Sequence, residues 1–90
     1  MTTISREQFR VLEGIAYWRA EIAWTVERYG ADDVDLPKFR ATLESLLDEA
    51  DRKSIPWAVQ NNVLVFAENW RAEKSRYLDC VLLEKGVKVA

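Results

Sequence analysis

The sequence predicts an all-α protein, a single domain at 1–90 built as a three-helix bundle that runs up, down and up. Three observations support this class. The 90 residues include only three glycines and two prolines, which leaves little chain for loops. Apolar residues recur at the helical period through most of the chain. Helix-start and helix-stop signals divide it into helices of about 6–29, 37–53 and 55–85.

The first predicted helix has signals at both ends. Ser5 followed by Gln8 is a capping box, and Gly30 supplies a residue that tolerates the left-handed conformation after the last turn. One broad apolar stripe follows from the helical period: Phe9, Leu12, Ile15, Ala16, Ile22, Ala23, Val26 and Tyr29. Tyr17 and Trp24 lie almost opposite this stripe, so their rings are candidates for a second, outward face.

The second predicted helix begins near Pro37, a residue suited to the first turn, with Asp35 or Leu36 at the cap. Glu49 and Lys53 have the spacing of an ion pair on its outer side. Its apolar stripe is narrow: Phe39, Leu43, Leu46, Leu47 and Ala50. We therefore expect this helix to pack against the other two.

The third predicted helix starts after Ser54 and ends at Gly86. The segment 63–66 alone resembles a strand, but a helical apolar pattern extends over a much longer stretch. Asn61-Asn62 is the weak point, where a break would give a fold of four elements. A second stripe runs along another side: Trp57, Leu64, Ala67, Leu78 and Leu82. With two apolar faces, this helix is either the central element or an interface, and dimerisation could complete the bundle.

One polar pair tests the arrangement. Arg19 interrupts the apolar stripe of the first helix, and Glu73 interrupts that of the third. If these two helices run parallel, both residues lie at nearly the same height. We expect them to pair, because one charge alone in a buried seam would be costly.

Charge is uneven along the chain. Residues 31–51 carry a net charge of −5, with Lys38 and Arg40 as the only basic residues. The acidic residues of this segment are Asp32, Asp33, Asp35, Glu44, Asp48, Glu49 and Asp51. They could form an acidic surface that docks on the basic groove of a nucleic-acid-handling protein and inhibits it. The alternative is an ordinary solvated helix.

Catalysis is disfavoured. The chain has no histidine, so Ser-His-Asp chemistry is impossible and the single Cys80 lacks its usual base. No Cys/His cluster, glycine-rich phosphate loop or calcium loop occurs, so we expect no enzyme activity, metal or cofactor. We expect Cys80 to be a small buried hydrophobe. With one cysteine, no leader and no long apolar run, a cytoplasmic location without membrane contact is expected.

Direct nucleic-acid binding is a weaker alternative, in the form of a helical DNA-binding regulator. The basic residues of the C-terminal part are Arg71, Lys74, Arg76, Lys85 and Lys88. Four acidic residues are interleaved with them, whereas phosphate binding needs a concentrated basic face. The sequence therefore disfavours nucleic acid as a partner.

Protein contact is the favoured role. Tyr17 and Trp24 are flanked by Arg10 and Arg28, and aromatic residues with arginine dominate interface hot spots. Both rings could instead extend the core, as we expect for Trp18 and Trp70. The alternative contact face is the stripe of Trp57, Leu64, Leu78 and Leu82. The sequence thus predicts a small regulatory module that binds another protein and self-associates as a homodimer.

Overall fold

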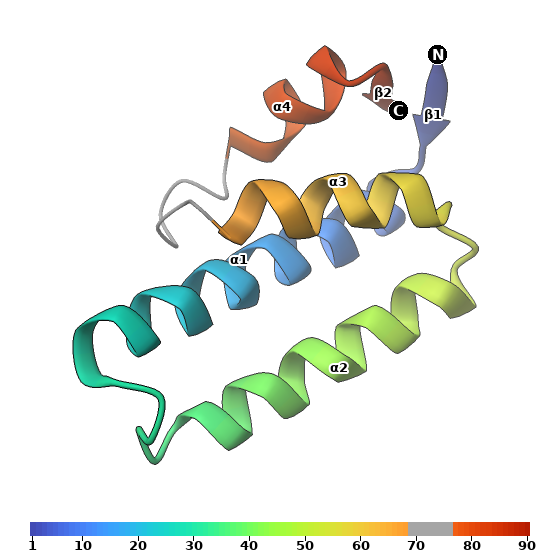
Figure 1. Ribbon diagram of the computed structural model, residues 1–90. Helices are drawn as coiled ribbons and strands as arrows, with labels where there is room; N and C mark the ends of the chain where they lie inside the picture. The colour runs from blue at the N-terminus through green and yellow to red at the C-terminus, as the bar shows by residue number, and fades with distance from the viewer. Residues whose placement is uncertain (69–76) are drawn as a thin grey trace.

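The first three helices form the predicted bundle. The computed structural model describes residues 1–68 and 77–90. Its elements in chain order are β1 (Thr2–Ile4), α1 (Arg6–Tyr29), α2 (Leu36–Arg52), α3 (Trp57–Glu68), α4 (Leu78–Glu84) and β2 (Val87–Val89). Helices α2 and α3 both pack against α1, and α1 and α3 run in the same direction with α2 opposed (Figure 1). The up-down-up order is therefore confirmed for α1 to α3.

The single third helix predicted at 55–85 is wrong. Helix α3 ends at Glu68, and α4 is a separate helix that begins after Tyr77 and lies above the three-helix layer (Figure 1). The break considered at Asn61-Asn62 does not occur, because both residues lie inside α3. A helical period shows which residues face inward. Two successive helices that pack on the same core can continue the same period, so the period alone does not show that one helix ends and another begins.

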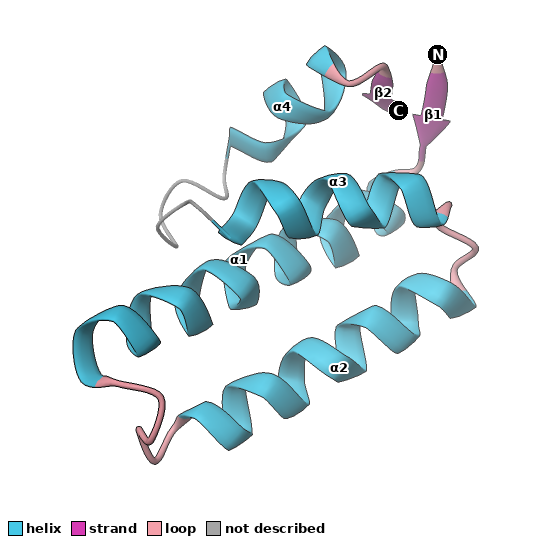
Figure 2. Cartoon of the chain, in the orientation of Figure 1, coloured by secondary structure: helices cyan, strands magenta, loops and turns pink. Residues whose placement is uncertain are grey.

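The chain is not purely helical either, because its two ends form a small parallel sheet (Figure 2). Thr2 pairs with Val87 and Ile4 with Val89. The amide of Thr2 donates to the carbonyl of Gly86 at 2.9 Å, and the amide of Ala90 donates to the carbonyl of Ile4 at 2.9 Å. Strands of three residues are too short to leave a period-2 pattern, so sequence patterns do not indicate them.

The predicted helix ends are confirmed for α1 and α2. The Ser5 hydroxyl accepts from the Gln8 amide at 3.1 Å, and the Gln8 side chain accepts from the Ser5 amide at 2.8 Å. Gly30 has a φ of 94° and closes α1. Asp35 is the N-cap of α2, with Pro37 in the first turn. At the start of α1 the capping box satisfies backbone donors that have no partner within the helix, whereas the Asp35 side chain makes no such bond and α2 begins with Pro37 in its first turn.

The core draws on every element. Its fully buried members include Leu12 and Ile15 of α1, Val63 of α3 and Leu78 of α4. Ile4 of β1 and Val87 of β2 are also buried, so the sheet closes the end of the core where the two termini meet. One member of the predicted stripe is misplaced: Tyr29 is 60% exposed, because it belongs to the last turn of α1, at the end of the bundle.

Candidate protein-contact surface

The outer face of α1 lies on the side of the helix away from Leu12 and Ile15, which are both completely buried. At about 100° per residue, the residues of this face fall within one arc opposite the core stripe. We define the α1 outer face by six residues: Arg10, Glu13, Tyr17, Glu21, Trp24 and Arg28. The sequence left open whether Tyr17 and Trp24 are exposed or part of the core; in the structure Tyr17 is exposed and Trp24 is half-buried.

Trp24 is half-buried, and residues of its own helix end surround it. Its ring centroid is 6.0 Å from that of Tyr29, with the planes nearly perpendicular at 84°. The guanidinium carbon of Arg28 lies 5.3 Å from the Trp24 centroid and 5.8 Å from that of Tyr29. A cation–π contact at such a site contributes about 0.5–1 kcal/mol. Trp24 is therefore held by a local cluster at the surface and does not join the central core.

Tyr17 is 42% exposed and rests on a chain of aromatic rings. Its ring meets the edge of Trp18 at a centroid distance of 5.2 Å, and Trp18 meets Phe39 of α2 at 5.2 Å. Trp18 packs against the buried core, as predicted, whereas Trp70 lies outside the described residues. Tyr17 is thus an outward ring on a rigid base, since its support continues into the α1–α2 contact.

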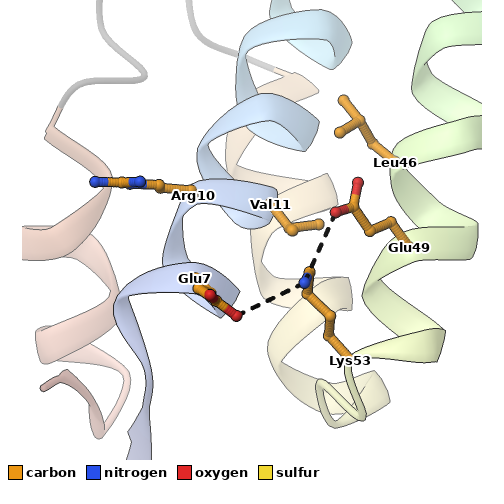
Figure 3. A pocket seen from close by; sticks show the side chains of 6 residues that line it. All are labelled: Glu7, Arg10, Val11, Leu46, Glu49 and Lys53. Carbon is orange, nitrogen blue, oxygen red and sulfur yellow. Dashed lines mark ion pairs between the residues drawn. The ribbon is translucent and has the colours of Figure 1, made fainter.

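Arg10 of the outer face also borders an open groove of about 370 Å³ between α1 and α2. On the far side of this groove, the Lys53 ammonium lies 3.8 Å from Glu7 and 3.9 Å from Glu49, the second being the predicted pair. Arg10 extends away from these three residues (Figure 3). The Lys53 charge is thereby matched within the groove, and the Arg10 charge belongs to the outer face.

The alternative stripe does not form one surface. Trp57 is 66% exposed at the start of α3, and Leu64 is half-buried against the core. Leu78 and Leu82 lie on α4 and are buried, at 0% and 1% exposure. They are core residues and not contact candidates, because the chain folds α4 back onto the bundle.

The predicted Arg19–Glu73 pair remains a prediction, because Glu73 lies outside the described residues. Arg19 is half-buried on α1, and it borders a groove of about 270 Å³ together with Ile22, Ala23 and Val26. This placement agrees with its expected position inside the apolar stripe.

The acidic segment spreads over α2 and the preceding loop. Three of its carboxylates have local partners: Asp33 accepts from the Asp35 amide at 2.9 Å, Asp51 accepts from Gln60 at 3.0 Å, and Glu49 pairs with Lys53. The remaining four are exposed: Asp32, Asp35, Glu44 and Asp48. Neutral amides donate to Asp33 and Asp51 and leave their charges in place, whereas Lys53 offsets the charge of Glu49, so the negative charge of this surface is spread over the loop and α2.

Two of the basic C-terminal residues lie in the described part of the chain. Lys85 and Lys88 are exposed at the end of α4 and on β2. Arg71, Lys74 and Arg76 lie outside the described residues, so the nucleic-acid alternative stays a prediction.

Cys80 is exposed, so the expectation of a buried cysteine is wrong. Leu78 and Leu82 form the inward face of α4, and Cys80, two residues from each, points to the opposite side. Within residues 1–68 and 77–90, no three Cys, Asp or Glu side chains gather as a metal site would require. None of the described helices is both long and apolar enough to cross a membrane. Comparison with protein families, curated proteins and solved structures gave no match for this chain.

Proposed function

We propose that this protein is a small non-enzymatic binding module that contacts another protein through the α1 outer face. The observation that carries the proposal is the placement of the exposed Tyr17 and the half-buried Trp24 seven residues apart on one face of α1, flanked by Arg10 and Arg28. Tyrosine, tryptophan and arginine are the residue types enriched at interface hot spots. Two aromatic anchors two turns apart on one helix suit a groove or helix face on a partner.

The local packing favours binding because it limits the conformational freedom that the side chains lose when a partner binds. Tyr17 rests on Trp18, and Trp24 is enclosed by Tyr29 and Arg28. Immobilising a free side chain at an interface costs about 0.5–1.5 kcal/mol. Rings that already have one geometry in the free protein avoid part of this cost. The α1 outer face is therefore better prepared for binding than Trp57, which is 66% exposed.

Photo-crosslinking in cells of the source organism tests the proposal. A photoreactive amino acid at position 21, between the two rings, should give a discrete crosslinked product. The product should disappear in the Tyr17→Ala/Trp24→Ala variant and persist in Trp57→Ala, which removes an exposed tryptophan elsewhere. Circular dichroism must show that both variants remain helical. A product that survives the Tyr17→Ala/Trp24→Ala change would contradict the proposal.

A second candidate function is the acidic inhibitor, and the exposed carboxylates of Glu44 and Asp48 favour it. A photoreactive amino acid at position 45, an exposed site on α2 between them, reports on this surface. A product at position 45 that is lost in Glu44→Gln/Asp48→Asn and weakened by salt would support a charge-driven partner. No product at position 45 under conditions that give one at position 21 would exclude α2 as the contact.

A further inference from the structure

We propose that the α1 outer face binds a second copy of this chain, with the two α1 helices packed antiparallel about a two-fold axis. The inference rests on the proposed function and names the partner. It is carried by the order of side chains along the face, which is complementary to itself when reversed.

The complementarity follows from two pairs of positions. Tyr17 and Trp24 are symmetric about a point between residues 20 and 21, and Glu13 and Arg28 are symmetric about the same point. In an antiparallel pair centred there, Tyr17 faces Trp24 of the second copy, and Glu13 faces Arg28. Each contact occurs twice, as a two-fold interface requires. One register therefore places ring against ring and opposite charge against opposite charge.

The four side chains also share one side of the helix. At 3.6 residues per turn, Glu13, Tyr17, Trp24 and Arg28 fall within about 60° of arc. Their strip spans about 22 Å along the axis at 1.5 Å per residue. Arg28 is exposed and already stacks on Trp24, so its charge sits beside the ring that the second copy would cover. The core-facing sides of α1 are not used, and α2 and α3 keep their contacts.

A second copy fits this face better than a partner of uniform charge. The face carries arginines at both ends and glutamates between them, so neither a basic nor an acidic groove would match all of it. The contact covers about four helical turns, at the small end of specific interfaces, so we expect a dissociation constant on the order of 10 µM.

One residue of the face opposes the pairing. Glu21 lies next to the axis, so each copy brings its carboxylate close to the same carboxylate of the other. Replacing it with glutamine removes the repulsion and leaves the size of the side chain unchanged. Glu21→Gln should therefore tighten the dimer several-fold, and the gain should shrink at high salt.

A charge swap measured by sedimentation velocity tests the register. Glu13→Arg and Arg28→Glu should each raise the dissociation constant of the dimer at least about tenfold. Each change places like charges opposite each other at positions 13 and 28, and this contact occurs twice in the two-fold dimer. The combined Glu13→Arg/Arg28→Glu variant restores opposite charges, and its dissociation constant should return to within about threefold of the unmodified chain. Failure of the combined variant to recover would overturn the antiparallel register. Trp57→Ala is the matched control and should leave the constant unchanged.

The outcomes separate this inference from the proposed function. An unmodified chain that stays monomeric up to about 1 mM would overturn the dimer. In that case a crosslinked product at position 21 must contain a different protein. Such a product would support the proposed function, and its absence would contradict it. A dimer that all the α1 variants leave equally stable would overturn the inference as well, because it would lie on another surface.

Discussion

The side-chain amide of Gln60 donates one hydrogen bond to Oδ1 of Asp51 at 3.0 Å and another to the carbonyl of Ile55 at 2.9 Å. Gln60 is only 2% exposed, although it is polar. It joins the end of α2 to the first turn of α3 across a connection in which Ser54 takes a positive φ of 60°. The amide thus holds a turn whose backbone is itself unfavourable for a residue with a Cβ.

Gln60→Glu should lower the free energy of unfolding by about 2–4 kcal/mol at neutral pH, because it buries a carboxylate beside Asp51 and a carbonyl oxygen. Burial and the Asp51 charge raise the pKa of the introduced carboxyl in the folded state. The loss is therefore greatest above that pKa and should diminish as the pH falls through it. Urea unfolding between neutral and mildly acidic pH measures this, with the unmodified chain as reference.

Gln60→Leu is the control for the pH effect. It removes the two donated hydrogen bonds without adding a charge, and the exposed Asp51 can turn to water, so the cost should be about 1–2 kcal/mol. The free energy of unfolding of Gln60→Leu should differ from that of the unmodified chain by the same amount at each pH, unlike that of Gln60→Glu. A Gln60→Glu loss that is the same at every pH would show that the carboxylate reaches solvent.

Gln60 also illustrates how far sequence analysis reaches in this chain. Its apolar neighbours gave the phase of α3, but a polar residue in a helix is normally expected at the surface. Only the tertiary arrangement, which brings the end of α2 over the first turn of α3, makes a buried amide favourable. The helices α1 and α2 were predictable because their caps are local; Gln60 was not, because its partner is nine residues away across a turn.

Gly14→Ala should stabilise the protein by about 0.5 kcal/mol. Alanine gains about 1 kcal/mol of helix propensity over glycine in a helix interior, against a small repacking cost. A Cβ on Gly14 would lie 3.0 Å from Cδ1 of Leu46, the end of a flexible side chain. Leu46 is half-buried beside the open groove and can move into it. Thermal and urea unfolding check this, and destabilisation by more than about 1 kcal/mol would show that Leu46 cannot yield.

Ile4→Ala should lower the free energy of unfolding by about 2–4 kcal/mol, because it removes a fully packed side chain and leaves a cavity. Ile4 is 2% exposed and belongs to the strand that pairs with β2. Thr3→Ala is the matched control on the same strand: Thr3 is exposed, and its loss should change stability by less than about 0.5 kcal/mol. Equal effects of the two changes, measured by urea unfolding, would show that β1 does not close the core.

The end of the chain was the part least accessible from sequence, for a physical reason. Val87 and Val89 flank Lys88, which is too short an alternation to distinguish a strand from the continuation of a helix. The pairing of Val87 with Thr2 joins opposite ends of the chain, and no local signal reports it. By contrast, the phase of a single, well-capped helix places Tyr17 and Trp24 on one side of α1, although the sequence left their exposure open.

Ser5→Ala and Gln8→Ala should differ in cost, although both break the same capping box. Ser5→Ala removes one cap and should cost about 1 kcal/mol. Gln8→Ala removes the acceptor for the Ser5 amide and also the hydrogen bond from Nε2 to the Lys53 carbonyl at 2.9 Å, so it should cost about 1 kcal/mol more. Gln8→Glu keeps an acceptor for the Ser5 amide but has no donor for Lys53, and its stability should fall between the unmodified chain and Gln8→Ala. Equal free energies of unfolding for Gln8→Glu and the unmodified chain would mean that the contact between α1 and the α2–α3 turn contributes nothing, and that capping alone explains the role of Gln8.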